Sequence, residues 1–322
     1  MNCLCRSLLK EYPMTKYIIK RLLLVIPMVL GVAIIVFSII NAIPGDPGRR
    51  MLGPMASQEQ VDILNEQLGY HLPFVQRLGN YLNDLVHLDF GNSYQDGEPV
   101  FEKIVKNFPY TLRLAVLQTI TYSIIGIALG VFSAVKQYSA LDNVVRVISI
   151  ALAAFPSFWV YMVALLVFSL YLGWLPSSGA DMWQCYILPV GCAGILSASS
   201  LQRLTRTTML ESIRQDFVRT ARAKGCAEGT VIWKHAFLNA MLPVLNQVGI
   251  SFGMLLGGTV IAESVFGMPG LGTLIITAVN SKDVPMVMAA TVFLAAIFCV
   301  LVVALDVITA LVDPRAKAKL TK

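Results

Sequence analysis

The cysteine and histidine residues are the first candidates for metal or redox chemistry, but their spacing supports neither. The six cysteines form no CxxC pair, and Cys3 and Cys5 make only a CxC near the N-terminus. His71 and His87 fall in different predicted helices. The phosphate-binding pattern GxxxxGK[ST] does not occur in the sequence. We therefore expect no metal site, no cofactor, no catalytic residue and no ATP hydrolysis on this chain.

A second set of candidates consists of ionisable and polar residues inside long apolar segments. Asp306 and Gln118 lie in such segments, and Glu263 lies at the outer end of another. Ionisable groups inside a membrane span are costly and often functional, so we take these three residues as candidates for a translocation path. The alternative is structural. A neighbouring helix or a partner subunit can satisfy Asp306, and the polar patch around Gln118 can pack between helices. Glu263 is expected near the outer end of its span, by a gate.

The composition places these residues in a membrane protein. Of 322 residues, 56% are hydrophobic and 14% are charged, and the mean hydropathy is +0.69. A soluble domain carries about 25% charged residues, so this chain cannot cover a water-facing surface. The net charge is +6, and the basic residues lie between and beside apolar runs. That pattern indicates a lipid bilayer as partner and not a nucleic acid. We expect an all-α integral membrane protein.

About six segments are long and apolar enough to cross a bilayer, which takes about 20 residues. They cover residues 17–43, 111–135, 144–172, 186–201, 242–262 and 284–312. The first is too long for a signal peptide, and no small-residue cleavage site follows it, so we interpret it as a permanent span. With the N-terminus inside, most of the 25 Lys and Arg residues fall in inside segments. The positive-inside rule then places both termini in the cytoplasm.

These spans divide the chain into five parts. They are a cytoplasmic segment (1–16), the first span (17–43), an extracytoplasmic helical insertion (44–109), the main transmembrane domain (110–315) and a cytoplasmic tail (316–322). Within the insertion, Ser57 and Gln60 have the spacing of a capping box for a helix over 57–68, and a second helix is expected over 74–88. The insertion is either a cap without chemistry or a docking surface for an extracytoplasmic partner.

A basic segment at 202–241 separates the fourth and fifth spans. Asp216 as a helix cap and Gly225 as a helix stop predict a helix of about two turns between them. So short a helix is not stable alone. It must lie on anionic lipid or dock into a groove of a cytoplasmic partner. Phe217, Ala221 and Lys224 are expected to share one face. The candidate residues are Phe217, Val218, Arg219, Thr220, Ala221, Arg222, Ala223, Lys224 and Gly225, with Glu228 just beyond.

This segment, DFVRTARAKG at 216–225 followed by KHAFLNAMLP at 234–243, resembles the cytoplasmic loop of binding-protein-dependent ABC importer permeases. It is similar to the dipeptide/oligopeptide/nickel branch in particular, because RTA at 219–221 replaces the Glu-Ala-Ala of the wider class. Further resembling motifs are PYTLRLA at 109–115, FPSFW at 155–159, GWLPSSG at 173–179, ESVF at 263–266, PGLG at 269–272 and DPR at 313–315. The resemblance begins near Met14, so we interpret residues 1–13 as an upstream mis-start.

The resemblance implies a set of partners in the cytoplasmic membrane of a prokaryote. These are a second homologous permease, an extracytoplasmic solute-binding protein and two cytoplasmic ABC ATPases that carry ATP and Mg. The short helix at 216–225 would couple the ATPases to the spans, with Arg219, Arg222 and Lys224 offering charge to the groove. A peptide is the expected solute, and nickel or a chelated metal is the alternative within the family. A self-sufficient secondary carrier is the alternative from another class.

Overall fold

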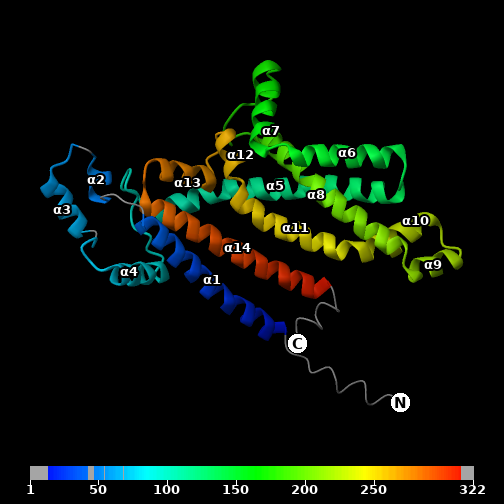
Figure 1. The fold of residues 1–322 in the computed structure, drawn as a ribbon, viewed down its shortest axis with the longest axis horizontal. Coiled ribbons are helices and arrows are strands. Elements are labelled where there is room, and N and C mark those ends of the chain that lie inside the picture. Colours follow the sequence, from blue (N-terminus) through cyan, green and yellow to red (C-terminus); the bar gives the residue numbers. More distant parts are fainter. Residues whose placement is uncertain (1–13, 43–46, 54, 68, 313–322) are drawn as a thin grey trace, which may run out of the picture.

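A computed structural model describes residues 14–42, 47–53, 55–67 and 69–312 of the chain. The described residues are helical and include no β-strand, which confirms the all-α prediction. The helices that form the body of the protein are α1 (Met14–Ala42), α5 (Val100–Val135), α6 (Ala140–Ala154), α8 (Ile187–Ile213), α11 (Leu238–Gly258) and α14 (Val284–Val312). Figure 1 shows α1 and α14 side by side, and α5 and α8 in the centre.

Within the described ranges, five helical stretches are long and apolar enough to cross a membrane, and a bent pair of helices makes a sixth when it is counted as one span. The bent pair joins α6 to α7 (Ser157–Ala164), which continues as a π-helix (Leu165–Tyr171). This agrees with the prediction of about six spans.

The third predicted span, however, is not straight, because its two helices meet at 98°. Pro156 cannot donate a backbone hydrogen bond and disfavours helical geometry at Phe155, whose backbone is extended. Figure 1 shows α7 at a steep angle to α6, projecting from the side of the molecule. A span predicted from hydropathy alone contains no signal for the direction of such a bend.

Three helices extend beyond the apolar segments that predicted them. α5 begins at Val100, well before residue 111, and a 3₁₀ turn (Trp183–Tyr186) runs into α8, which ends at Ile213 instead of 201. The fifth span starts with α10 (Glu228–Thr230) and a π-helix (Val231–Phe237) before α11. Helical hydrogen bonding continues where the apolar run stops, because polar side chains can project from the same helix into water.

The insertion between the first two spans contains α2 (Pro47–Leu52), α3 (Gln58–Gln67) and α4 (Phe74–Val86). Its predicted capping box is present. The Ser57 amide donates to Gln60 Oε1 over 3.1 Å, and the Gln60 amide donates to Ser57 Oγ over 3.3 Å. In Figure 1 the insertion lies at one end of the molecule, and α9 (Asp216–Ala223) lies at the opposite end.

Glycine allows α5 and α8 to pack closely along their length. A Cβ atom added to Gly130 would lie 2.5 Å from Thr205 Cβ, and one added to Gly126 would lie 2.8 Å from Leu201 Cβ. From the other helix, a Cβ at Gly194 would lie 2.6 Å from Thr121 Cγ2. Small residues at such positions let two membrane helices approach each other. The α5–α8 pair is therefore the most extensive helix–helix contact of the described chain.

We expect Gly130→Ala to lower the free energy of unfolding by about 1–3 kcal/mol, the usual cost of overpacking a filled interior. The matched control is Gly191→Ala on α8, where an added Cβ meets no atom within 4 Å. Thermal unfolding of the two purified variants in detergent tests this difference. Equal midpoints would show that the helices can separate at no cost.

A second set of glycines, on α11, packs within the same chain. A Cβ at Gly249 would lie 2.5 Å from Leu305 Cδ2, and one at Gly253 would lie 2.7 Å from Phe298 Cε2, both on α14. The helical spacing of these glycines by itself predicts either packing against another helix, such as one of a partner permease, or a hinge. The structure places α14 there instead, whereas Gly257 has no such neighbour.

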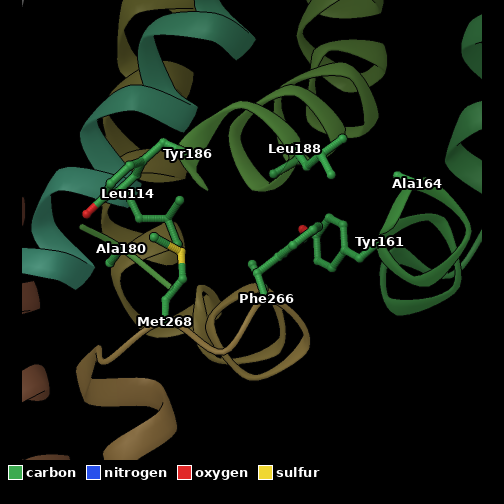
Figure 2. Packing of buried hydrophobic residues seen from close by; sticks show 10 residues of the cluster. Leu114, Tyr161, Ala164, Ala180, Tyr186, Leu188, Phe266 and Met268 are labelled. Atoms are coloured by element: carbon green, nitrogen blue, oxygen red, sulfur yellow. The ribbon is translucent and has the colours of Figure 1, made fainter. Parts of the chain in front are cut away.

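A buried apolar cluster joins α7, α8 and the segment around α12 (Val260–Val265) to α5. Figure 2 shows Tyr161, Leu188, Phe266 and Met268 converging from these separate elements, with Leu114 of α5 beside them. Tyr161 and Phe266 are in ring contact, with centroids 5.9 Å apart. This cluster positions the α12 segment and the short helix α13 (Leu271–Asn280) that follows it.

Candidate functional site

The short helix α9 occupies the predicted residues, but it begins differently from the prediction. Gln215 holds the N-cap position and makes no side-chain cap bond. Asp216 is therefore not the cap. It lies in the first turn, where its exposed carboxylate forms an ion pair with Arg219 over 3.8 Å and favours the positive end of the helix dipole. The prediction failed because α8 ends at Ile213 and the turn after it sets where α9 starts.

The other end of α9 is as predicted. Gly225 has a φ of +77°, the left-handed conformation that favours glycine. Its amide donates to the Arg222 carbonyl over 2.9 Å, and the Cys226 amide donates to the Ala221 carbonyl over 3.2 Å. This pair of bonds is a Schellman motif, which satisfies the last carbonyls and reverses the chain sharply. α9 is thus a short helix with a well-defined end.

We expect Gly225→Ala to cost about 1–2 kcal/mol, because a Cβ is unfavourable at a left-handed backbone position. Gly225→Asn should cost less, since Asn tolerates this conformation. Gly229→Ala is the control, because that glycine has neither a positive φ nor a close neighbour. Amide hydrogen exchange over α9 measures the effect. Equal protection in the Ala and Asn variants would contradict the expectation.

The inner face of α9 packs on the ends of the membrane helices. Val218 and Ala221 are buried there, whereas Phe217 is 42% exposed. The predicted face of Phe217, Ala221 and Lys224 is therefore not the buried one. The residues of the cluster that receives α9 are Val131 and Ala134 of α5, Met209 of α8, Val231 and Ala236 of the π-helix, and Ala240 of α11. This packing supplies the stability that an isolated two-turn helix lacks.

The outer face of α9 carries exposed charge, but one of its cations is already paired. Arg222 Nη2 donates to Glu228 Oε1 over 2.6 Å, and Arg222 Nε donates to Glu228 Oε2 over 3.1 Å. This bidentate contact raises the pKa of Arg222 and closes the turn after α9. Arg222 therefore braces the loop. Thr220, Ala223 and Lys224 are exposed beside Phe217 and Arg219.

A buried ion pair behind α9 ties α6 to α8. Arg206 Nε and Nη2 donate to the two carboxylate oxygens of Asp142 over 2.9 and 2.8 Å. Asp142 is fully buried and also accepts hydrogen bonds from the Ser133 hydroxyl and from the Tyr138 amide. All four contacts are donors to one carboxylate. Sequence reasoning missed this pair. The only signals in the sequence were an acidic residue in the first turn of a helix, Asp142, and an arginine beyond the apolar segment 186–201, Arg206.

Glu263, predicted beside an outer gate, lies on α12 and is fully buried. Its Oε1 accepts from the hydroxyls of Thr111 and Thr259 over 2.7 and 3.0 Å. Its Oε2 accepts from the amides of Gly272 and Thr273 over 2.7 and 3.2 Å. The carboxylate therefore satisfies the free amides at the start of α13, where the helix dipole favours a negative charge.

Two glycines make room for this carboxylate. A Cβ at Gly272 would lie 2.5 Å from Val260 Cα, and a Cβ at Gly270 would overlap the Glu263 carboxylate. Thr111 also accepts from the Leu271 amide over 2.8 Å. The PGLG and ESVF segments thus form one unit that holds α12 and α13 against α5.

A second buried carboxylate, Asp283, holds the other end of α13, and sequence reasoning missed it. It accepts from the Ser93 hydroxyl and, over 3.1 Å, from the Tyr94 amide. It also accepts over 3.4 Å from the Met286 amide in the first turn of α14. The loop before α5 is therefore bound to the turn between α13 and α14.

The remaining path candidates have different surroundings. Gln118 is buried, and its Nε2 donates to the Pro189 carbonyl of α8 over 3.3 Å, while its Oε1 has no partner among the described residues. Tyr122, in the same polar patch, donates to Ser251 of α11 over 3.2 Å. The side chain of Asp306 lies outside the described part of the chain. The structure thus brings Gln118 between packed helices. Among the described residues, no three His, Cys, Asp or Glu side chains are grouped to hold a metal ion.

Comparison with known proteins matches nearly the whole chain to one family. Residues 126–318 match the family described as binding-protein-dependent transport system inner membrane component, and residues 14–115 match the N-terminal region of such membrane components. The chain is 37% identical over 306 residues to the glutathione transport system permease protein GsiC of Escherichia coli strain K12 and to that of Salmonella typhi. Each alignment covers 95% of this chain and 100% of the relative.

A solved structure has the same fold in its membrane domain. A chain from the inward-facing MetNI methionine ABC transporter superposes with a TM-score of 0.56 at 18% identity, covering 67% of this chain and 99% of that one. At this identity the similarity concerns the fold. The family matches and the full-length relatives establish the rest. The chain belongs to the family of binding-protein-dependent transport system inner membrane components and is a permease subunit of an ABC importer.

Proposed function

We propose that this chain and a second, homologous permease form the path for a short peptide delivered by an extracytoplasmic binding protein. The support for a peptide is the full-length similarity to permeases named for glutathione, a peptide-like solute. Two cytoplasmic ABC ATPases, which carry ATP and Mg²⁺, would drive the transport. Both termini and α9 then lie in the cytoplasm, in agreement with the distribution of basic residues.

The observation that carries this mechanism is the seating of α9. Val218 and Ala221 are buried against α5, α8, the π-helix and α11. Phe217, Arg219 and Lys224 remain exposed at the end of the molecule. A helix held in this way transmits a push from a partner to α5, α8 and α11 together. We therefore assign α9 as the helix that docks into an ATPase groove. Arg222 and Glu228 keep its exit turn rigid.

The test is a docking-face variant, Phe217→Ser with Arg219→Glu, in the complete transporter. We expect the permease to fold normally but to lose the co-purifying ATPases and ATP-dependent uptake, because both substitutions lie on the exposed face. Lys136→Glu, an exposed charge reversal at the end of α5, is the control. If the docking-face variant assembled and transported like the wild type, α9 would not be the coupling helix.

The solute is tested separately in proteoliposomes that contain the complete transporter and its binding protein. We expect ATP-dependent uptake of a radiolabelled dipeptide or of glutathione, unaffected by Ni²⁺. Uptake of radioactive nickel without peptide uptake would overturn the peptide assignment and favour the metal alternative. Neither result depends on which residues dock to the ATPases.

A further inference from the structure

A cavity of about 300 Å³ lies between the insertion and the ends of two membrane spans. One wall is a single face of α4, from which Arg77, Asn80, Tyr81 and Asp84 line the cavity. Their spacing of three, four and seven residues from Arg77 places them on one side of the helix. The permease function described above assigns no role to this polar stripe.

The wall that the spans supply is apolar except for Asn41, and the loop before α5 adds Asp89 and Tyr94 to the lining. Phe37, from the last turns of α1, and Met288 and Ala289, from the second turn of α14, line it. Because both spans end here, the cavity lies at the level of a membrane surface, at the end of the molecule opposite α9 (Figure 1). The α4 wall is therefore polar enough to bind a lipid headgroup, and the wall from the spans can contact apolar parts of a lipid.

Arg77 and Tyr81 provide hydrogen-bond donors at one end of the stripe. Arg77 Nη1 donates to Asn41 Oδ1 over 2.8 Å, and the guanidinium stacks over Tyr70, but its buried Nε has no partner among the described residues. The Tyr81 ring stacks on Phe37 with centroids 5.2 Å apart, and its buried hydroxyl also lacks a partner there. Burial raises the pKa of Tyr81 to about 12, so the hydroxyl keeps its proton. Unpaired buried donors cost about 1–3 kcal/mol each, so an anionic group bound beside them would remove that cost.

Asp84 provides the complementary charge. It lies three residues beyond Tyr81, about 4.5 Å along the helix axis. Within the described chain its carboxylate forms no ion pair and accepts no side-chain hydrogen bond. An ammonium group at this position would be close to an anion held by Arg77 and Tyr81. Along α4, Arg77 and Tyr81 therefore form a site for an anion, and Asp84 forms a site for a cation next to it.

We propose that this cavity binds a small zwitterion, with its anionic group on Arg77 and Tyr81 and its ammonium group on Asp84. Two sources have this chemistry. One is the headgroup of phosphatidylethanolamine, whose glycerol region would contact Phe37 and Met288. The other is a free short peptide. The position beside the ends of two spans and the apolar residues Phe37 and Met288 favour the lipid.

The experiment is native mass spectrometry of the complete, delipidated transporter titrated with phosphatidylethanolamine, phosphatidylglycerol or dialanine. We expect saturable binding of phosphatidylethanolamine or dialanine that is tighter than binding of the purely anionic phosphatidylglycerol. Arg77→Gln should weaken binding of every ligand by about 10- to 100-fold, the loss expected for a charged hydrogen bond. Asp84→Asn should weaken only the zwitterions. Tyr81→Phe keeps the ring stacked on Phe37 but removes the hydroxyl donor, so it should also weaken binding. It tests the site even where Arg77→Gln or Asp84→Asn does not assemble.

Lys106→Gln and Glu59→Gln, exposed charge removals away from the cavity, are the matched controls. Binding of phosphatidylethanolamine identifies a lipid site, and binding of dialanine alone identifies a peptide site; both support the zwitterion. Three results overturn it. They are no saturable binding, binding unchanged by Arg77→Gln and Tyr81→Phe, and equal binding of phosphatidylglycerol with no effect of Asp84→Asn.

Discussion

Asp142→Asn should destabilise the protein by about 3–5 kcal/mol, the usual cost of breaking a buried ion pair from one side. The Asp142 carboxylate accepts four hydrogen bonds, from Arg206, Ser133 and Tyr138, and the exposed Arg146 lies 3.9 Å from it. An asparagine has one acceptor oxygen, so its NH₂ group must face either Arg206 Nε or Nη2. Arginine cannot accept a hydrogen bond, and the Arg206 charge is left uncompensated. The measurement is thermal unfolding of the purified permease complex, together with uptake.

The double variant Asp142→Asn with Arg206→Met tests whether the instability comes from the unpaired Arg206 charge or from the asparagine itself. Without the arginine, the asparagine oxygen can accept from the Tyr138 amide, and its NH₂ group can donate to the Ser133 hydroxyl. We therefore expect the double variant to be more stable than Asp142→Asn alone. Thr207→Ala is the control, because Thr207 is exposed beside Arg206 and its hydroxyl bonds only within its own helix. A double variant as unstable as the sum of its two single variants would show that the contacts are not coupled.

Glu263→Ala should have an effect of similar size on the packing of α12 and α13. It leaves the Gly272 and Thr273 amides without an acceptor, and each buried unpaired donor costs about 1–3 kcal/mol. The start of α13 would then detach from α12 and from Thr111. We expect loss of uptake and a lower unfolding temperature. Ser264→Ala, the next residue and exposed, is the control, since its hydroxyl bonds only within its own helix.

Glu263→Gln distinguishes hydrogen bonding from charge at this site. Unlike Asp142, Glu263 faces two hydroxyl groups, those of Thr111 and Thr259, which can accept as well as donate. A glutamine can therefore direct its oxygen to the amides and its NH₂ group to the hydroxyls. We expect Glu263→Gln to retain much of the stability that Glu263→Ala loses. A glutamine variant as defective as the alanine variant would mean that the negative charge itself is required.

These two carboxylates show what a single sequence does not contain. Asp142 and Arg206 are 64 residues apart, and Thr111 and Glu263 are 152 residues apart. Nothing in the local sequence of either partner specifies the other. The buried pairing depends on how α5, α6, α8 and α12 pack, and that packing depends on contacts such as those of Gly126 and Gly130.

Local features were predictable where one residue type suffices. The capping box at Ser57 and the left-handed stop at Gly225 follow from the side-chain oxygen of one residue and the absence of a Cβ in the other. The position of Asp216 was not predictable in the same way. Whether an acidic residue is a cap or lies in the first turn depends on where the preceding helix ends.

By itself, the sequence determined that this chain is a helical membrane protein with about six spans and a short basic helix between the fourth and fifth. These are properties of single segments, because the transfer of an apolar run into lipid and the formation of helical hydrogen bonds require no distant partner. The tertiary structure decided the bend at Pro156, the buried face of α9 and the partners of Asp142, Glu263 and Asp283. Each of these depends on side chains from separate helices meeting in space, and only the packed arrangement brings them together.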